Sequence, residues 1–399
     1  MHNQALHNQR VLIIGAGIAG TAAAMAFQRV GIEATIYEAY EGTAHGVGGA
    51  LGVATNGFDV LRTLGVADQV SATGWPTTKI ALWNGAGRRL GIADDGTIAV
   101  TAERARLYDA LYGETVRRGI PIEHGKRLVG VEHQGEQVIA RFDDGTSASG
   151  TVLVGADGMY SAVRELVAPD APKPHYVGLT GCGDYSAPMD LGLDPSTFHM
   201  VFGKRAFFGY AGLPDGRVGW FANVPTPVEP TGDDLTAVPL SARRAQLLDL
   251  FANDNTPATR IVEATERVDL WLALYHMDPP RHWYRDRMVL IGDAARAPSP
   301  SSGQGASLAL EDALELAKCL RDRPDPASAF ATFQQLRDKR VAKVMAAAKR
   351  INSNKAAGPV GRVIRDALAP VAMKLFTRPN ARAWLYQHHI ELDEPLLVH

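Results

Sequence analysis

The sequence predicts an α/β protein that has a parallel sheet, an inserted and mainly antiparallel β domain, and C-terminal helices. Three observations predict this architecture. An apolar run, a glycine-rich turn and an alanine-rich stretch follow one another near the start, short apolar runs dominate residues 175–275, and helical periodicity continues from residue 305. With 399 residues and 46% hydrophobic content, the chain can bury a large core and is expected to form two or three domains.

The first elements expected form a βαβ unit. Residues 11–14, VLII, are an uninterrupted apolar run, as in parallel strands that are buried on both faces. A helix over 21–30 follows, which Gly31 can cap, and residues 34–38 are expected to be the second strand.

Later elements follow from periodicity and turn signals. Helical patterns cover 57–70 and 101–118, and strands are expected at 128–142 and 151–155 on either side of the turn DDGT. The runs 197–203, 206–213 and 217–224 predict an antiparallel sheet, the Pro-rich stretch 225–239 a surface loop, and 288–293 another buried strand.

Composition excludes several classes of protein. The formal net charge of -2 makes nucleic acid a poor default partner. The two cysteines, Cys182 and Cys319, lie far apart and outside any metal-binding pattern, so neither a disulfide scaffold nor a zinc site is expected and a reducing, cytoplasmic setting fits. No signal peptide is expected, because the polar first ten residues run directly into an apolar strand, and no apolar run reaches the roughly 18–20 residues of a membrane-spanning helix.

The first chemical motif is a G-x-G-x-x-G, Gly15-Ala16-Gly17-Ile18-Ala19-Gly20, placed between strand and helix. This placement is typical of Rossmann-like nucleotide binding, in which the helix N-terminus meets a pyrophosphate. Glu38 ends the second strand, where a carboxylate accepts hydrogen bonds from ribose hydroxyls and disfavours a 2′-phosphate. The alternative is a tight turn that binds no ligand.

Two further motifs follow in the chain: LVGADGMYSAVR at 153–164 and LIGDAARAPSPSSGQGASLALEDA at 290–313. With GAGIAG and Glu38, they resemble the three ordered fingerprints of the para-hydroxybenzoate hydroxylase-like, class A flavoprotein monooxygenases. The resemblance covers about 11–350, and GGALGVATNG at 48–57 and the stretch from Arg104 to Leu107 agree with it.

The resemblance implies FAD as cofactor, NADPH or NADH as reducing co-substrate, and a C4a-hydroperoxide that delivers oxygen from O2. Asp293 would bind the ribityl chain, Asp157 the pyrophosphate region and the reducing cofactor, and Pro300 would lie against the flavin ring. Backbone N–H groups from Gly303 to Ser307 would face N1 and the C2 carbonyl, where a helix start favours negative charge. The implied cofactor-binding residues are Gly15, Gly17, Ile18, Ala19, Gly20, Glu38, Arg104, Asp157, Gly158, Gly292, Asp293, Pro300, Gly303, Gln304, Gly305, Ala306 and Ser307. The loop residues Pro300, Gly303, Gln304 and Gly305 carry the catalytic assignment, without a side-chain base.

Three positions depart from the family pattern. Arg296 stands where a histidine is common, Ser307 where an asparagine is common, and Ala39 where an arginine is frequent. Arg296 is expected either to pair with a phosphate, a substrate acid or the flavin, or to be solvated.

The substrate is expected to be an aromatic or polycyclic small molecule that lies on the antiparallel sheet. Its candidate contacts are Phe202, Phe208, Tyr210 and Trp220, with Phe207 and Phe221 also considered. Strand alternation lets only about half of these face one side. His199 or Tyr210 is a candidate for assisting deprotonation of a phenol, although a lone histidine on a strand more often has a structural role.

The resemblance also divides the chain into domains. The FAD-binding domain is expected over 8–72, 101–174 and 281–350, the substrate domain over 73–100 and 175–280, and a C-terminal helical region over 351–399. A basic amphipathic stretch around 360–376 is a candidate for peripheral membrane contact, although packing on its own domain is favoured.

Two other flavoenzyme classes remain as alternatives. A flavin-dependent halogenase is disfavoured because its W-x-W-x-I-P motif has alanine at position 222 here, between Trp220 and Pro225. A flavoprotein reductase of prenyl chains would not consume oxygen together with NAD(P)H. The single G-x-G-x-x-G argues against reductases that have two nucleotide-binding domains.

Overall fold

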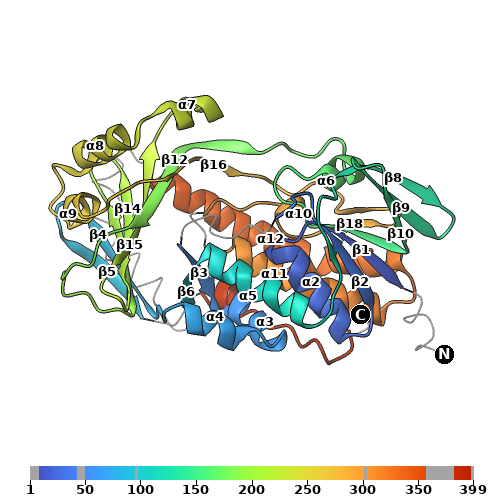
Figure 1. Cartoon of the computed structure of the whole chain (residues 1–399). Helices are drawn as coiled ribbons and strands as arrows, with labels where there is room; N and C mark the ends of the chain where they lie inside the picture. Colours follow the sequence, from blue (N-terminus) through green and yellow to red (C-terminus); the bar gives the residue numbers. More distant parts are fainter. Residues whose placement is uncertain (1–8, 43–49, 95–97, 301–302, 356–381, 397–399) are drawn as a thin grey trace.

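The computed structural model describes residues 9–42, 50–94, 98–300, 303–355 and 382–396. They form two lobes (Figure 1), which we call the α/β lobe and the sheet lobe. The predicted α/β fold with an inserted antiparallel sheet is confirmed.

The α/β lobe is built on a six-stranded sheet in the order β17-β18-β11-β1-β2-β7. All neighbours in it are parallel except β17 and β18. Its strands are β1 (Arg10–Ile14), β2 (Glu33–Tyr37), β7 (Ile122–Glu123), β11 (Val152–Gly155), β17 (Tyr284–Arg285) and β18 (Met288–Leu290). Residues 11–14 are buried, as an apolar strand between two covered faces requires.

Helices and two small antiparallel sheets complete this lobe. The helices are α2 (Ile18–Arg29), α3 (Thr55–Thr63), α4 (Ala67–Thr73), α5 (Arg104–Arg117), α6 (Ala162–Val167), α10 (Gly292–Ala295), α11 (Gly305–Asp322), α12 (Pro326–Lys355) and α14 (Ala383–Tyr386). The small sheets pair β3 (Ala50–Ala54) with β6 (Ile98–Glu103), and join β8 (Leu128–Gln134), β9 (Gln137–Phe142) and β10 (Ser147–Gly150). The single helix expected over 57–70 is two helices because Gly65, with φ 74°, turns the chain between them.

The sheet lobe contains seven strands in the order β16-β12-β15-β14-β13-β4-β5, in which only β13 and β4 pair in parallel. They are β4 (Lys79–Asn84), β5 (Arg89–Asp94), β12 (His175–Tyr185), β13 (Thr197–Phe202), β14 (Phe207–Gly212), β15 (Val218–Pro225) and β16 (Leu270–His276). They come from segments assigned to the substrate domain, whose residue boundaries stay a prediction.

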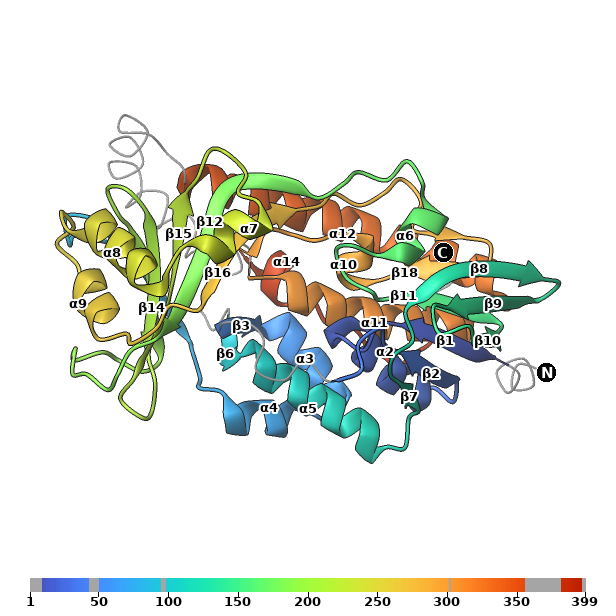
Figure 2. The ribbon, with the colours of Figure 1, turned by 45° about the horizontal axis from the view of Figure 1, so that its top comes forward.

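Three helices that sequence patterns did not predict belong to the sheet lobe: α7 (Gly232–Ala237), α8 (Leu240–Phe251) and α9 (Ala258–Glu263). Short α7 lies in the expected Pro-rich loop and begins with a capping box between Thr231 and Asp234. Helices α8 and α9 pack on one face of the sheet, on the side away from the α/β lobe (Figures 1 and 2). We call the covered face the outer face and the opposite one the inner face.

Among the described residues, no helix is long and apolar enough to cross a membrane, and no cluster of metal-binding side chains occurs. The basic stretch around 360–376 lies outside the described residues.

Candidate active site

The turn between β1 and α2 brings two of the predicted motifs together. Gly15 has φ 104°, and a Cβ there would lie 2.6 Å from the carbonyl oxygen of Ala156 and 3.0 Å from Cα of Asp157. A Cβ on Gly20 would overlap the carbonyl oxygen of Gly15. By contrast, nothing lies within 4 Å of a Cβ built on Gly17. Packing therefore requires glycine at 15 and 20, whereas Gly17 leaves its backbone open to a ligand.

The third motif meets the same helix. Gly292, with φ 58°, lies where a Cβ would be 2.7 Å from Cβ of Ala19 in α2 and 3.5 Å from Cβ of Ala309 in α11. The first turns of α2 and α11 therefore approach each other at the residue that precedes Asp293. This convergence joins segments that are 270 residues or more apart in the chain.

Among the described residues, neither helix N-terminus has a capping side chain. The N-cap residues, Gly17 of α2 and Gln304 of α11, make no side-chain cap hydrogen bond, and neither first turn contains an acidic residue. Unpaired N–H groups and the helix dipole favour an anion at such ends. Gly303, which precedes α11, has φ 61° and no atom within 4 Å of an added Cβ, so its own backbone has open space beside it.

Glu38 lies against the glycine-rich turn. Its Oε2 accepts a hydrogen bond from the Ala16 N–H at 2.7 Å, and Oε1 accepts one from the Tyr40 N–H at 3.1 Å. The carboxylate is thus fixed at the end of β2, beside the start of α2.

Asp293 and Arg104 come together although 189 residues separate them. Burial raises the pKa of the Asp293 carboxyl, and the positive charges of Arg296 and Arg104 oppose that shift. No hydrogen bond to its carboxylate is found among the described residues. A half-buried acceptor of this kind fits a ligand hydroxyl, which would satisfy it.

Asp157 has partners inside the chain. Its carboxylate accepts hydrogen bonds from the Ser161 hydroxyl at 2.5 Å and from the Val163 N–H at 3.2 Å. Burial raises the pKa of this carboxyl, and the Ser161 hydroxyl opposes the shift. The side chain therefore holds the start of α6, and no atom lies within 4 Å of a Cβ built on the neighbouring Gly158.

The loop before α11 is only partly described. Pro300 is exposed, residues 301–302 lie outside the described residues, and Gln304 and Ser307 are buried. A Cβ on Gly57 of α3 would lie 2.5 Å from the Ser307 hydroxyl oxygen. This close approach explains why a small side chain occupies position 307, where the family commonly has asparagine.

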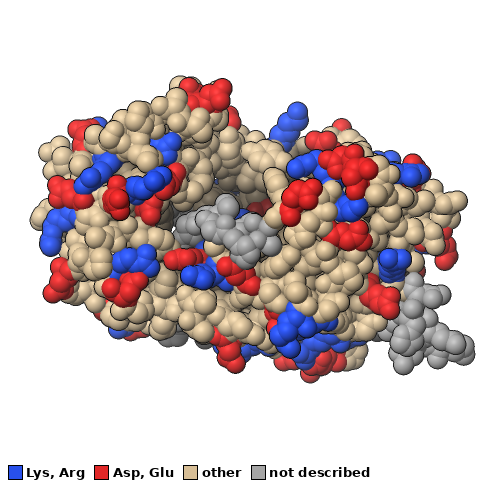
Figure 3. Space-filling view, viewed as in Figure 1, with Lys and Arg blue, Asp and Glu red and all other residues tan. Residues whose placement is uncertain are grey.

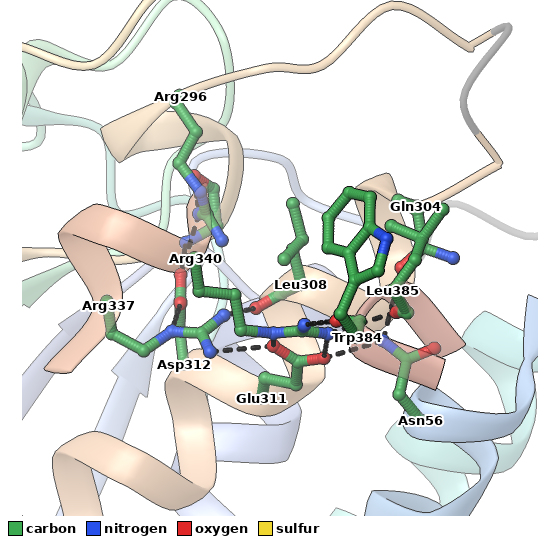
Figure 4. Close-up of polar contacts among 11 residues, drawn as sticks. Asn56, Arg296, Gln304, Leu308, Glu311, Asp312, Arg337, Arg340, Trp384 and Leu385 are labelled. Atoms are coloured by element: carbon green, nitrogen blue, oxygen red, sulfur yellow. Dashed lines mark hydrogen bonds and ion pairs between the residues drawn. The ribbon is translucent and has the colours of Figure 1, made fainter. Parts of the chain in front are cut away.

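Arg296 lies in the protein interior, so the expectation that it is solvated is wrong, whereas its pairing with a ligand stays a prediction. It is 1% exposed, its Nη1 lies 2.6 Å from Oδ2 of Asp312, and it donates to the Gly292 carbonyl at 2.7 Å. Asp312 Oδ2 also accepts the Gly292 N–H at 2.9 Å. The N–H and the carbonyl of Gly292, the residue before Asp293, are therefore bound by the side chains of Asp312 and Arg296. Asp312 of α11 also supplies the negative charge that pairs with Arg296 (Figure 4).

A buried charge network continues from Asp312 (Figure 4). Arg337 of α12 donates to Asp312 at 2.8 Å and to Glu311 at 2.6 Å, and Arg340 binds both carboxylate oxygens of Glu311. Asn56 donates to Glu311 at 2.5 Å and to the Gln304 side-chain oxygen at 3.1 Å. The network thereby connects α12 to the residue that starts α11.

Sequence reasoning missed this network. Glu311 and Asp312 are both fully buried, and they stand within a mainly apolar stretch, ASLALEDALELA. Two consecutive acids in an apolar helix require buried cations, and that signal could have directed attention to the arginines of the next helix.

The predicted substrate contacts separate onto the two faces of the seven-stranded sheet. Phe208, Tyr210 and Trp220 lie on the outer face, no more than 5% exposed, and belong to the core that includes α8 and α9. The prediction that these three line a substrate pocket is therefore wrong, because helices cover them. Phe202 lies on the inner face, paired across strands with Phe207.

His199 also lies on the covered outer face. Its Nδ1 accepts a hydrogen bond from Nε1 of Trp83 at 3.1 Å, and its ring stacks on Tyr210 with a centroid distance of 4.7 Å. Burial lowers the pKa of His199, so the neutral ring serves packing. Neither His199 nor Tyr210 stays a candidate base.

Comparison with known proteins agrees with this geometry. The family described as FAD binding domain matches residues 8–348. The chain belongs to this family of FAD-dependent monooxygenases. Aurachin C monooxygenase/isomerase of Stigmatella aurantiaca is 31% identical over 352 residues, which cover 86% of this chain and 88% of that protein. FAD-dependent urate hydroxylase of Klebsiella pneumoniae is 30% identical, with 83% and 86% covered.

A solved structure is similar over nearly the whole monooxygenase. Klebsiella pneumoniae HpxO complexed with FAD and uric acid has a TM-score of 0.81 at 25% identity, and the match covers 91% of this chain and 93% of that one. This flavoprotein monooxygenase therefore uses FAD and acts on a small aromatic molecule. The halogenase alternative loses its remaining support, because Trp220 of the partial motif is a core residue.

The C-terminal segment of the monooxygenase packs against the back of the charge network. Arg340 donates to the Trp384 carbonyl at 2.6 Å, Lys318 to the Glu391 carbonyl at 2.6 Å, and Arg321 to the Glu394 carbonyl at 2.9 Å. These bonds fix residues 384–394 through their backbone.

Lowering the pH from about 7.5 to about 5 is expected to destabilise this segment through His388, with a decrease in melting temperature of about 2 °C. The pKa of His388 is lowered to about 4, mainly by burial, with Arg340 and Arg337 adding to the shift and Glu311 opposing it. Because the folded-state pKa lies below the ordinary value, the stabilisation is present above about pH 6.5 and is lost as the pH falls toward the folded-state value.

A His388→Gln variant is the control for this prediction. Asp59 and Glu391 raise the pKa of His389, so the effect of His389 on stability as the pH falls is opposite to that of His388. His389 is present in both proteins, and the difference between wild type and the variant therefore isolates His388. Equal pH dependence of the two melting temperatures would show that His388 does not contribute.

Proposed function

We propose that this monooxygenase uses NAD(P)H and O2 to insert one oxygen atom into an aromatic or polycyclic small molecule, by hydroxylation or epoxidation. The observation that supports the proposal most is the meeting of three distant motifs at the start of α2. Gly15 packs against Ala156 and Asp157, and Gly292 packs against Ala19.

The residues present fit FAD, and we propose the following contacts. The open backbone of Gly17 and the uncapped N-terminus of α2 would bind the pyrophosphate, with Ile18, Ala19 and Gly20 forming the first turn. Glu38 would accept hydrogen bonds from the adenosine ribose, although it also accepts the Ala16 N–H. Asp157 and Gly158 would border the pyrophosphate. The Asp157 carboxylate would contribute mainly by holding residues 157–163 in place through its hydrogen bonds to Ser161 and Val163.

The second half of the cofactor would lie near α10 and α11. Asp293 would accept a ribityl hydroxyl, and Arg104 would lie beside it. Backbone N–H groups from Gly303 to Ser307 would stabilise negative charge on the reduced ring, by roughly 0.3–2 kcal/mol per favourable interaction. The buried pair of Arg296 and Asp312 would keep Gly292, and with it Asp293, in place.

When bound at these residues, FAD would supply the redox chemistry, in which two electrons from NAD(P)H allow one oxygen atom of O2 to enter the substrate and the other to leave as water. The protein has to keep water away from this reaction and hold the substrate ring beside the flavin. The inner face of the sheet and the start of α11 are the surfaces that would do so.

Oxygen incorporation tests the proposal. The purified protein, loaded with FAD, is supplied with NADH or NADPH, 18O2 and a panel of aromatic compounds, and products are analysed by mass spectrometry. We expect at least one compound to accelerate NAD(P)H oxidation and to gain one labelled oxygen atom. If every compound that accelerates oxidation yields only labelled hydrogen peroxide, oxygen insertion is contradicted while FAD binding is not.

We also propose that the protein works in the cytoplasm. Cys182 and Cys319 are both free and buried, and burial raises the pKa of Cys182 to about 12. Thiols in this state are unreactive and need no oxidising compartment. We expect both to react with a thiol reagent only after unfolding; a disulfide-linked species in protein purified from cells would contradict the proposal.

A further inference from the structure

Asn56, the second residue of α3, is buried against α11 and makes two hydrogen bonds through one nitrogen. Its side chain is 1% exposed. Nδ2 donates to Oε1 of Glu311 at 2.5 Å and to Oε1 of Gln304 at 3.1 Å. Asn56 therefore connects the N-cap residue of α11 to a carboxylate about two turns further along the same helix (Figure 4).

The charge of Glu311 determines which end of the Asn56 amide faces α11. Arg337 binds the Glu311 carboxylate at 2.6 Å and Arg340 binds it at 2.7 and 2.5 Å, so the carboxylate is ionised and can only accept hydrogen bonds. The amide nitrogen of Asn56, which carries two hydrogens, must then face it. Oδ1 of Asn56 is buried without a hydrogen-bond partner in the described part of the chain, so the two acceptors of the nitrogen impose this orientation.

The second hydrogen of the same nitrogen holds the side chain of Gln304. Because Nδ2 of Asn56 donates, the end of the Gln304 amide that faces it is the oxygen. A side-chain oxygen at the N-cap is the group that could accept the first N–H groups of a helix, but Gln304 makes no side-chain cap hydrogen bond. Asn56 therefore directs this oxygen away from the N–H groups of the first turn of α11.

Gly57, the residue after Asn56, brings α3 into direct contact with the first turn of α11. A Cβ at position 57 would lie 2.5 Å from Oγ of Ser307 and 2.9 Å from its Cα. The Leu308 N–H donates to the Gln304 carbonyl at 2.8 Å, so the helix is regular from its N-cap onward. Two adjacent residues of α3 thus fix the start of α11, one by hydrogen bonding and the other by packing.

Glu311, Asn56 and Gln304 form a buried series of side chains that we call the Asn56 relay. Each of the three is no more than 1% exposed. On the face of the molecule in Figure 3, by contrast, Lys and Arg side chains are interspersed with Asp and Glu over both lobes. Opposite surface charges offset one another and are screened by water and salt, whereas hydrogen bonds in the interior are not. The relay is therefore placed to influence a charge that develops at the start of α11.

We infer that Asn56 is a positioning residue that makes the start of α11 favour the reduced, anionic form of FAD over the oxidised form. The inference rests on the proposed function, in which backbone N–H groups from Gly303 to Ser307 face the flavin ring. These groups stabilise the negative charge of the reduced ring only when they point toward it. Asn56 acts on them through Gln304, the N-cap residue.

Asn56→Leu tests the inference, because leucine has a similar size and cannot donate a hydrogen bond. The dissociation constant of oxidised FAD and the midpoint potential of bound FAD are measured. We expect the affinity for reduced FAD to fall at least about tenfold more than that for oxidised FAD, which lowers the two-electron potential by about 30 mV. A merely structural role weakens both redox states equally, so an unchanged potential overturns the inference.

A second substitution tests whether Asn56 acts through Gln304. Gln304→Met removes the acceptor, keeps a side chain of similar length, and should lower the potential by a similar amount. If the two residues belong to one relay, the double variant should lower the potential no further than either single variant does. Additive shifts would show that the two residues act separately, and they would overturn the inference.

Asn253→Leu, at an exposed position of the sheet lobe, is the matched control and should leave the potential unchanged. If Asn56→Leu does not fold, Asn56→Ser takes its place. A serine hydroxyl carries one hydrogen and cannot donate to Glu311 and Gln304 together, so the potential should again fall.

The titration of the wild-type protein separates this inference from the proposed function. A wild type that binds FAD, with a potential that the variants do not change, contradicts only the role of Asn56. A folded wild type that does not bind FAD contradicts the proposed function itself.

Discussion

Replacing Arg337 by methionine is expected to lower the free energy of unfolding by about 3 kcal/mol, since removing one partner of a buried ion pair leaves an uncompensated charge. Arg337 is 1% exposed and binds both Glu311 and Asp312. Burial alone would lower the pKa of its guanidinium, but Glu311 and Asp312 outweigh burial and raise it. Burial opposes ionisation of Glu311, but Arg337 and Arg340 outweigh burial and lower the pKa of its carboxyl to about 2.

The control is the same arginine-to-methionine substitution in an ion pair that is exposed instead of buried. Arg141 of β9 makes two hydrogen bonds to Glu132, at 3.0 and 2.9 Å, but its side chain is 47% exposed. Arg141→Met should therefore cost less than about 1 kcal/mol. Urea-induced unfolding of both variants gives the comparison, and equal losses would mean that the buried network contributes no special stability.

Replacing Asp293 by alanine is expected to weaken FAD binding by about 10–100-fold, because a hydrogen bond to a charged acceptor contributes about 1.5–3 kcal/mol. The carboxylate is positioned at the start of α10, next to Gly292, whose N–H and carbonyl are bound by Asp312 and Arg296. Titration of the FAD-free protein with FAD, followed by flavin fluorescence, measures the change.

Asp293→Asn is the matched variant, because its amide oxygen still accepts a hydrogen bond. It should retain FAD more tightly than Asp293→Ala does. If the alanine variant binds FAD as tightly as wild type, Asp293 does not contact the cofactor.

Much of the α/β lobe could be predicted from the sequence because its signals are local. A buried strand, a turn that requires glycine and an alanine-rich helix occupy consecutive residues, and only glycine satisfies the backbone at position 15. The position of Gly292 against Ala19 followed only from resemblance, since no local pattern joins residues so distant in the chain.

The substrate side of the sheet could not be predicted in the same way. Alternation separates Phe207 from Phe208, but it does not say which of them a helix will cover. Helices α8 and α9 decide that question, and their amphipathic pattern is too weak to have been recognised. Aromatic residues on both faces of the strands therefore looked equivalent until the packing was known.

The ion pair between Arg296 and Asp312 could not be predicted from the sequence either. Its position in a ligand-binding motif suggested contact with a ligand, whereas its partner, Asp312, lies 16 residues later on α11. Pairing between a loop and the following helix depends on how that helix returns to the sheet, and neither propensity nor spacing determines it.

Spectroscopic titration with FAD tests the central claim most directly. The claim is that the starts of α2 and α11, joined at Gly292, form one binding site for a single FAD. We expect the purified protein to be yellow, or to bind one FAD per chain when FAD is added, with the flavin fluorescence changed on binding. A correctly folded protein that is colourless and does not bind added FAD would contradict this account.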